Sequence, residues 1–115
     1  MITNKEEYLL YLEQDKKALG ITKEKPAFIG DEVWKFERRL RKTEYLLNVS
    51  HKGPFYKIRY IVSMFFFHRM RVRLGYSIPL NVFDSGLSIA HRGTIVINGN
   101  AKIGKNCRIQ ECTTI

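Results

Sequence analysis

The sequence predicts an α+β protein, in which a helical N-terminal region (residues 1–75) is followed by the first coils of a parallel β-helix (residues 76–115). Two observations lead to this fold class. Aliphatic residues recur every six positions near the C-terminal end. Charged residues, which are frequent in the first part of the chain, become much less frequent after Gly75. Beyond that point β-branched residues increase and glycines recur as turn signals. The boundary is therefore expected near residues 75–80.

The repeat has a period that neither an α-helix, at about 3.6 residues, nor a strand, at about 2, produces. Its members are Phe83, Ile89, Ile97, Ile103, Ile109 and Ile115, with a two-residue slip at Ile95-Val96. Hexapeptide repeats are typical of a parallel β-helix, in which equivalent residues stack one coil apart. The slip lies close to His91, so the repeat is interrupted beside a histidine.

Two helices are expected before residue 50. The first begins at a capping box, residues 3–6, and ends before Gly20. The second begins at Asp31 as its N-cap and carries Phe36, Leu40 and Leu47 on one face. Its other face is expected to be charged and solvated, and comprises Glu37, Arg38, Arg39, Arg41, Lys42 and Glu44.

A third helix is expected from Pro54, which suits the first turn, to about Leu74, with Gly75 as its stop. Arginines near its end complement the helix dipole. Its aromatic residues are interpreted as helix-packing residues: Tyr56, Tyr60, Phe65, Phe66 and Phe67. His51 is interpreted as a loop residue and His68 as a helix-surface residue.

The net charge of +9 is unevenly distributed, because no acidic residue lies between Glu44 and Asp84. The basic residues of that stretch include Lys52, Lys57, Arg59, Arg69, Arg71 and Arg73. Such a field attracts anions, for example a phosphorylated cofactor or an acidic lipid surface. No nucleic-acid-binding signature accompanies it, so nucleic acid is not expected as a partner. Alternatively, acids elsewhere on the chain or on a neighbouring subunit neutralise the charge.

The chain is expected to reside in a reducing cytoplasm. No apolar run approaches the roughly 20 residues of a membrane-spanning helix, and the polar N-terminus does not resemble a signal peptide. The two cysteines, Cys107 and Cys112, form neither a disulfide framework nor a metal-ligand spacing, so no metal is expected.

The segment from Gly75 to Ile109 reads GYSIPLNVFDSGLSIAHRGTIVINGNAKIGKNCRI. It resembles the serine acetyltransferase family, and within it the acyltransferases encoded with bacterial capsule and surface-polysaccharide genes. The most specific element is His91, which stands between a Leu-x-Ile hexad and a Gly-Thr-Ile slip. The resemblance extends more loosely over residues 34–47.

This resemblance implies a left-handed parallel β-helix that assembles into homotrimers, with acetyl-CoA bound as acyl donor in grooves between neighbouring chains. It also implies that His91 is the catalytic general base, which takes a proton from the acceptor hydroxyl. A histidine titrates near ~6.5, so it can accept a hydroxyl proton at neutral pH. The alternative is a polar surface histidine at a corner of the coil.

The chain departs from the family at two positions. Tyr76 stands where the family has a carboxylate partner for the histidine, and Ala90 replaces the acidic residue that holds the amino group of serine. Asp84 is the nearest upstream acid and is a candidate to orient His91 or to bind substrate. The acceptor is therefore left open between serine, which would indicate cysteine biosynthesis, and a sugar or glycan, which would indicate polysaccharide biosynthesis.

The family's glycine-rich segment and most of its acetyl-CoA contacts would lie beyond Ile115, so the chain is interpreted as an N-terminal fragment whose cofactor-binding residues are not identified. Two alternatives to an active O-acetyltransferase follow. One is a catalytically inactive truncated remnant. The other is a basic module that docks on an anionic membrane through the third helix, at the inner face of the membrane.

Overall fold

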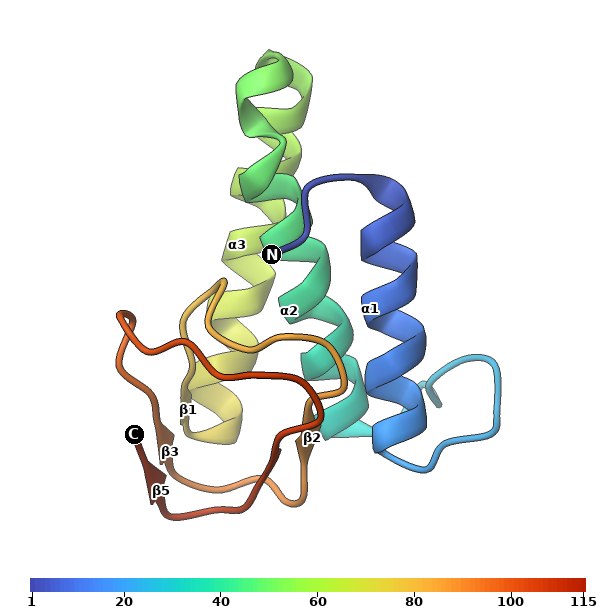
Figure 1. Cartoon of the computed structure of the whole chain (residues 1–115), viewed down its shortest axis with the longest axis vertical. Coiled ribbons are helices and arrows are strands. Elements are labelled where there is room, and N and C mark those ends of the chain that lie inside the picture. Colours follow the sequence, from blue (N-terminus) through green and yellow to red (C-terminus); the bar gives the residue numbers. More distant parts are fainter.

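The computed structural model describes residues 1–115 and contains three α-helices followed by short parallel strands (Figure 1). Helix α1 covers Lys5–Ala18, α2 covers Glu32–Asn48 and α3 covers Pro54–Leu74, with a 3₁₀ turn, η1, at Ser50–Lys52. Helix α2 packs against both α1 and α3. The three helices predicted from periodicity are confirmed. No helix combines the length and the apolar character needed to cross a bilayer.

Asp31 precedes α2 as predicted, but its φ is +53° and its side chain makes no capping hydrogen bond, since it accepts the Ala27 N–H instead. The ends of α1 and α3 follow the expected chemistry with one shift. The N-cap of α1 is Asn4, whose Oδ1 accepts the Glu7 N–H at 2.8 Å, while a carboxylate oxygen of Glu7 accepts the Thr3 N–H at 3.1 Å. The capping interaction is therefore displaced by one residue from the box predicted at Thr3. Gly75 ends α3 as predicted, with φ of +80° and its N–H donated to the Arg71 carbonyl at 2.9 Å.

Five strands of two residues follow Gly75. They are β1 (Tyr76–Ser77), β2 (Ser88–Ile89), β3 (Ile95–Val96), β4 (Arg108–Ile109) and β5 (Thr113–Thr114). Strands β1, β3 and β5 form one parallel sheet, and β2 and β4 form another. A single parallel bridge joins Phe83 to Ile103. Each pairing joins residues 18 to 20 positions apart, as 76 with 95, 95 with 113, and 88 with 108.

The predicted left-handed parallel β-helix is not found, although the α+β class is correct. The C-terminal region instead forms one three-stranded and one two-stranded parallel sheet. A solenoid coil gains most of its stability from neighbouring coils. Here the strands are two residues long, and their buried side chains share one core with Phe36, Leu40, Phe67 and Leu74 of the helices.

One hydrophobic core joins the helices to the C-terminal region. The Phe36 ring on α2 stacks on the Phe67 ring of α3, with the ring centroids 5.4 Å apart, and forms a T-shaped pair with the Tyr76 ring, with the centroids 4.8 Å apart. The repeat positions point into this core: Phe83, Ile89, Ile97 and Ile109 are buried, and Ile103 is partly buried. Ile115 departs from the pattern, because it is 48% exposed.

The charged face predicted for the second helix is wrong at three positions, because Glu37, Arg41 and Glu44 are buried. The two carboxylates accept backbone N–H groups of β2 and of the segment before it. Glu44 accepts the Asn81 N–H at 2.7 Å, and Glu37 accepts the Ile89 N–H at 3.0 Å. These carboxylates supply acceptors to N–H groups that have no strand partner, which is why burial is tolerated.

A second carboxylate site lies on α1. Asp15 is buried and accepts the N–H groups of Gly86 and Leu87 at 3.0 and 2.9 Å. Gly86 has a φ of +85°, and a side chain there would place its Cβ 2.3 Å from Oδ1 of Asn106. The turn that Asp15 binds therefore requires glycine at position 86, both for its positive φ and for the lack of space for a Cβ.

Glu37 provides a prediction about pH. Burial, reinforced by the charge of Asp15, raises the pKa of Glu37 well above its ordinary value of 4.5, and its Oε1 has no hydrogen-bond partner. The folded state thus retains a proton that the unfolded chain releases, so the free energy of unfolding falls as pH rises above about 4.5, until the folded pKa is passed. For Glu37→Gln we expect this fall to be reduced, and a variant about 1 kcal/mol more stable than the wild type at pH 8.

Urea unfolding at a series of pH values measures this difference. Glu13→Gln changes an exposed carboxyl of α1 and serves as the control. If wild type and Glu37→Gln give parallel curves from pH 4 to pH 8, the raised pKa of Glu37 is refuted.

Candidate functional site

His91 lies just after β2, in the short segment that connects β2 to β3. Its side chain is exposed and forms no hydrogen bond within the chain, whereas its carbonyl accepts the Tyr76 hydroxyl. The backbone on either side is held: Ala90 donates its N–H to the Ile109 carbonyl at 2.8 Å, and Gly93 donates to the Leu74 carbonyl at 3.2 Å. The imidazole is therefore free while its main chain is anchored.

Tyr76 adds a third anchor at the position where the resemblance would place a carboxylate. Its hydroxyl donates to the His91 carbonyl at 2.9 Å. Burial raises the pKa of Tyr76 to about 12, so the hydroxyl keeps its proton and remains a donor at neutral pH. Tyr76 thus positions the main chain of His91 and does not orient the imidazole.

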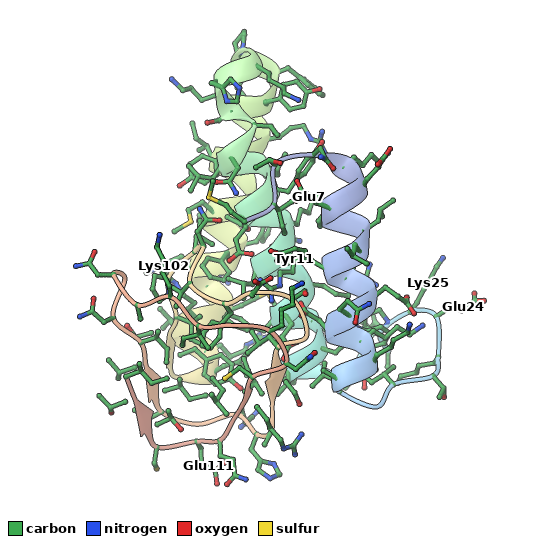
Figure 2. All side chains as sticks on the ribbon, in the orientation of Figure 1. Glu7, Tyr11, Glu24, Lys25, Lys102 and Glu111 are labelled. Atoms are coloured by element: carbon green, nitrogen blue, oxygen red, sulfur yellow. The ribbon has the colours of Figure 1, made fainter.

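Gly93 brings this segment close to the turn at Glu111, which Figure 2 labels at the lower end of the C-terminal region. The φ of Gly93 is +148°, and an added Cβ would lie 2.7 Å from Cβ of Glu111. A larger residue at this position would push the two segments apart. The close approach is a further restraint on the main chain that carries His91.

The hydrogen bonds of Asp84 join residues other than His91. Its carboxylate accepts the Tyr11 hydroxyl at 3.0 Å and the Ser85 N–H at 2.7 Å, and the Ser85 bond lowers the pKa of Asp84. No hydrogen bond joins Asp84 to His91. Asp84 instead lines a cavity of about 340 Å³ together with Tyr11 and Lys102, both labelled in Figure 2. Its role in binding substrate remains a prediction.

The other candidate residues are scattered. His51 is exposed in η1, and His68 is exposed on α3, where its Nδ1 lies 3.2 Å from Arg71 Nη2. Both cysteines are free, and burial raises the pKa of the Cys107 thiol. No group of three or more His, Cys, Asp or Glu side chains lies close enough together to hold a metal ion.

The sequence reasoning missed the buried ionic cluster that holds the segment before β2 against the helices. In it Arg41 forms ion pairs with Asp15 and Glu44, and Glu37 accepts the Ile89 N–H. The sequence feature that could have predicted this cluster is the spacing of Glu37, Arg41 and Glu44. These residues are four and three positions apart, so they share one face of the helix. That face adjoins the apolar stripe of Phe36 and Leu40.

The aromatic residues of α3 were also misassigned in part. Of the three consecutive phenylalanines, only Phe67 is buried, whereas Phe65 and Phe66 are 57% and 45% exposed. Tyr56 and Tyr60 are partly buried. A run of three bulky residues cannot share one face of a helix, since successive residues turn by about 100°. Helix α3 therefore presents aromatic side chains to solvent.

For Tyr76→Phe we expect a folded protein that loses about 1 kcal/mol of stability, because a buried hydroxyl–carbonyl hydrogen bond is removed. Faster hydrogen exchange is expected for the amides of residues 91–93, which the bond restrains. Urea unfolding and amide exchange measure the two effects. Tyr60→Phe, which removes a hydroxyl with no partner within the chain, is the control. Unchanged exchange in Tyr76→Phe would show that the other contacts alone hold the segment.

Comparison of the chain with known proteins finds no match: no family model fits it, and no curated protein or solved structure is significantly similar to it. The functional assignment therefore depends on the sequence motif around His91 and on the geometry of the segment that carries it.

Proposed function

We propose that this chain is an acetyl-CoA-dependent O-acetyltransferase in which His91 is the general base. The observation that carries the proposal is an exposed imidazole on an anchored main chain, held by Tyr76 and by the N–H groups of Ala90 and Gly93. A general base needs both properties, because it must reach the acceptor while keeping a fixed position. The sequence motif around His91 supports the same role.

In the proposed reaction the imidazole of His91 takes the proton of an acceptor hydroxyl. The acceptor oxygen then attacks the thioester carbonyl carbon of acetyl-CoA. A carbon–oxygen bond forms, the carbon–sulfur bond breaks, and the departing thiolate takes the proton from the imidazolium. The products are an acetyl ester and free coenzyme A, and no oxidant or reductant is required.

The acyl donor would bind where His91 faces solvent. Arg92 follows His91 and is exposed, and its charge suits the phosphates of coenzyme A. A neighbouring copy of the chain would complete the groove, since the resemblance implies a homotrimer. The positive net charge of the chain favours an anionic ligand of this kind.

The assay measures release of the free thiol when acetyl-CoA is mixed with the protein and either serine or a panel of sugars. We expect release that depends on the acceptor, with an acetylated product of matching mass. In parallel, titration with acetyl-CoA is expected to shift the NMR signals of the His91 ring. Absence of both turnover and ring shifts would refute the proposal.

For the acceptor we expect weak acetylation of free serine and better turnover with a sugar hydroxyl. Ala90 precedes His91, so no carboxylate is available there for the ammonium group of an amino acid. For Ala90→Asp we expect kcat/KM for serine to rise about tenfold, the value of one charge-assisted hydrogen bond. Ala90→Asn, of similar size but uncharged, is the control. Efficient serine acetylation by the wild type would show that another residue holds the amino group.

A further inference from the structure

Helix α3 has a face that no other part of the chain covers. Figure 1 shows α3 along one side of the molecule, with α2 between it and α1. Four apolar side chains on this face are each more than half exposed: Ile58, Ile61, Phe65 and Val72. Their spacings of three, four and seven residues align them along one stripe of the helix. We call this stripe the outer face of α3.

Basic side chains border the outer face. The guanidinium of Arg59 lies over the Phe55 ring at 5.5 Å, and that of Arg69 lies over the Phe65 ring at 5.7 Å. These contacts keep positive charge beside the exposed aromatic surface. Helix α3 contains no acidic residue that could neutralise it.

A groove of about 620 Å³ lies beside this face, on the side of α2. Arginines from both helices line it, Arg39 from α2 and Arg69 and Arg73 from α3, together with Phe66 and Val72. Guanidinium groups bind phosphate through paired hydrogen bonds. The groove thus offers several donors for phosphate next to an apolar surface.

We infer that the outer face of α3 docks on an anionic phospholipid bilayer. The exposed apolar stripe would enter the boundary between headgroups and acyl chains, while the bordering arginines bind lipid phosphates. The helix would lie on the bilayer, since none in this structure is long and apolar enough to cross one. The inference rests on α3 and on the groove that it shares with Arg39 of α2, and it is independent of the role of His91.

The charge and the apolar residues of the outer face favour an acidic bilayer as its partner over a second copy of the chain or a nucleic acid. A second copy of the chain would bring two basic faces together, because α3 has no acid to pair with the arginines of its partner. A nucleic acid would match the charge but would leave Ile58, Ile61 and Val72 exposed to water. An acidic bilayer matches both the charge and the apolar stripe.

Flotation of the full chain with vesicles tests the inference, with phosphatidylcholine alone compared with a mixture that contains phosphatidylglycerol. We expect binding only to the acidic vesicles, and weaker binding at high salt. The double variant Arg69→Glu and Arg73→Glu, and separately Phe65→Ser, should each lower binding, the charge variant at least about tenfold. All substituted side chains are exposed, and circular dichroism verifies the fold.

The matched control is Lys102→Glu with Lys105→Glu, which makes the same charge change on exposed residues of the C-terminal region. Its vesicle binding should exceed that of the α3 charge variant at least about fivefold. Equal losses in the two double variants, or equal binding to neutral vesicles, would overturn the inference. So would self-association that Phe65→Ser abolishes without vesicle binding, or binding to an RNA homopolymer in place of vesicles.

Discussion

His91→Ala is expected to lower acetyl transfer by about 10²–10⁴-fold, the usual cost of removing a general base. The loss should appear in kcat, with little change in the affinity for acetyl-CoA, because the imidazole acts on the acceptor proton. The fold should be retained, since the side chain is exposed and has no hydrogen-bond partner within the chain. Acceptor-dependent release of coenzyme A measures the effect.

His51→Ala provides the control, because this histidine is exposed in η1, far along the chain from the anchored segment. It should retain wild-type turnover. If His91→Ala is folded and keeps more than about a tenth of the normal rate, His91 is not the general base.

Arg41→Met is expected to lower the free energy of unfolding by about 3–5 kcal/mol, the cost of breaking a buried ion pair. Arg41 is fully buried. Its Nε lies 2.6 Å from Asp15 Oδ2, and its Nη1 lies 3.0 Å from Glu44 Oε1. Burial opposes its charge, but Glu44 and Asp15 outweigh this and raise the pKa of Arg41. Methionine would leave two buried carboxylates without a countercharge.

The same side chain also ties the helices to the C-terminal region. Its two terminal nitrogens donate to the carbonyls of Phe83 and Asp84, each at 2.8 Å. Arg41→Lys should therefore be destabilising but less so, because an ammonium keeps the charge and cannot reach all four partners at once. Urea unfolding measures both variants, with Arg38→Met, on an exposed position of α2, as control. A loss below about 1 kcal/mol in Arg41→Met would show that the cluster is not a major source of stability.

The helices and the repeat positions could be read from the sequence because their signals are local. The stop of α3 at Gly75 follows from the conformational freedom of glycine, and the apolar periodicity placed Phe36 and Leu40 on the core side of α2. The six-residue spacing likewise predicted burial at Ile89 and Ile109. At the candidate site the motif singled out His91, and the structure adds the anchor from Tyr76.

The predictions that the structure contradicts share one cause, which is that the residues involved have tertiary partners far away in the sequence. Glu37 and Arg41 were assigned to a solvated face because charged residues are usually exposed. Their buried position depends on backbone groups of Ile89 and Phe83, which lie 52 and 42 residues away. The left-handed β-helix was predicted from the repeat spacing and the family resemblance, whereas the strands are two residues long, form two small sheets and share their core with the helices.

By itself, the sequence determined the three helices, the change in composition after Gly75 and the buried repeat positions. It also singled out the histidine beside the interruption of the repeat. Each of these features depends on residues that are close together in the chain. Only the tertiary structure decided which charges are buried, how the strands pair and which face of α3 stays open. These three features depend on the free energy of bringing together segments that are distant in the chain. A buried carboxylate, for example, is tolerated only if a hydrogen-bond donor from another element reaches it.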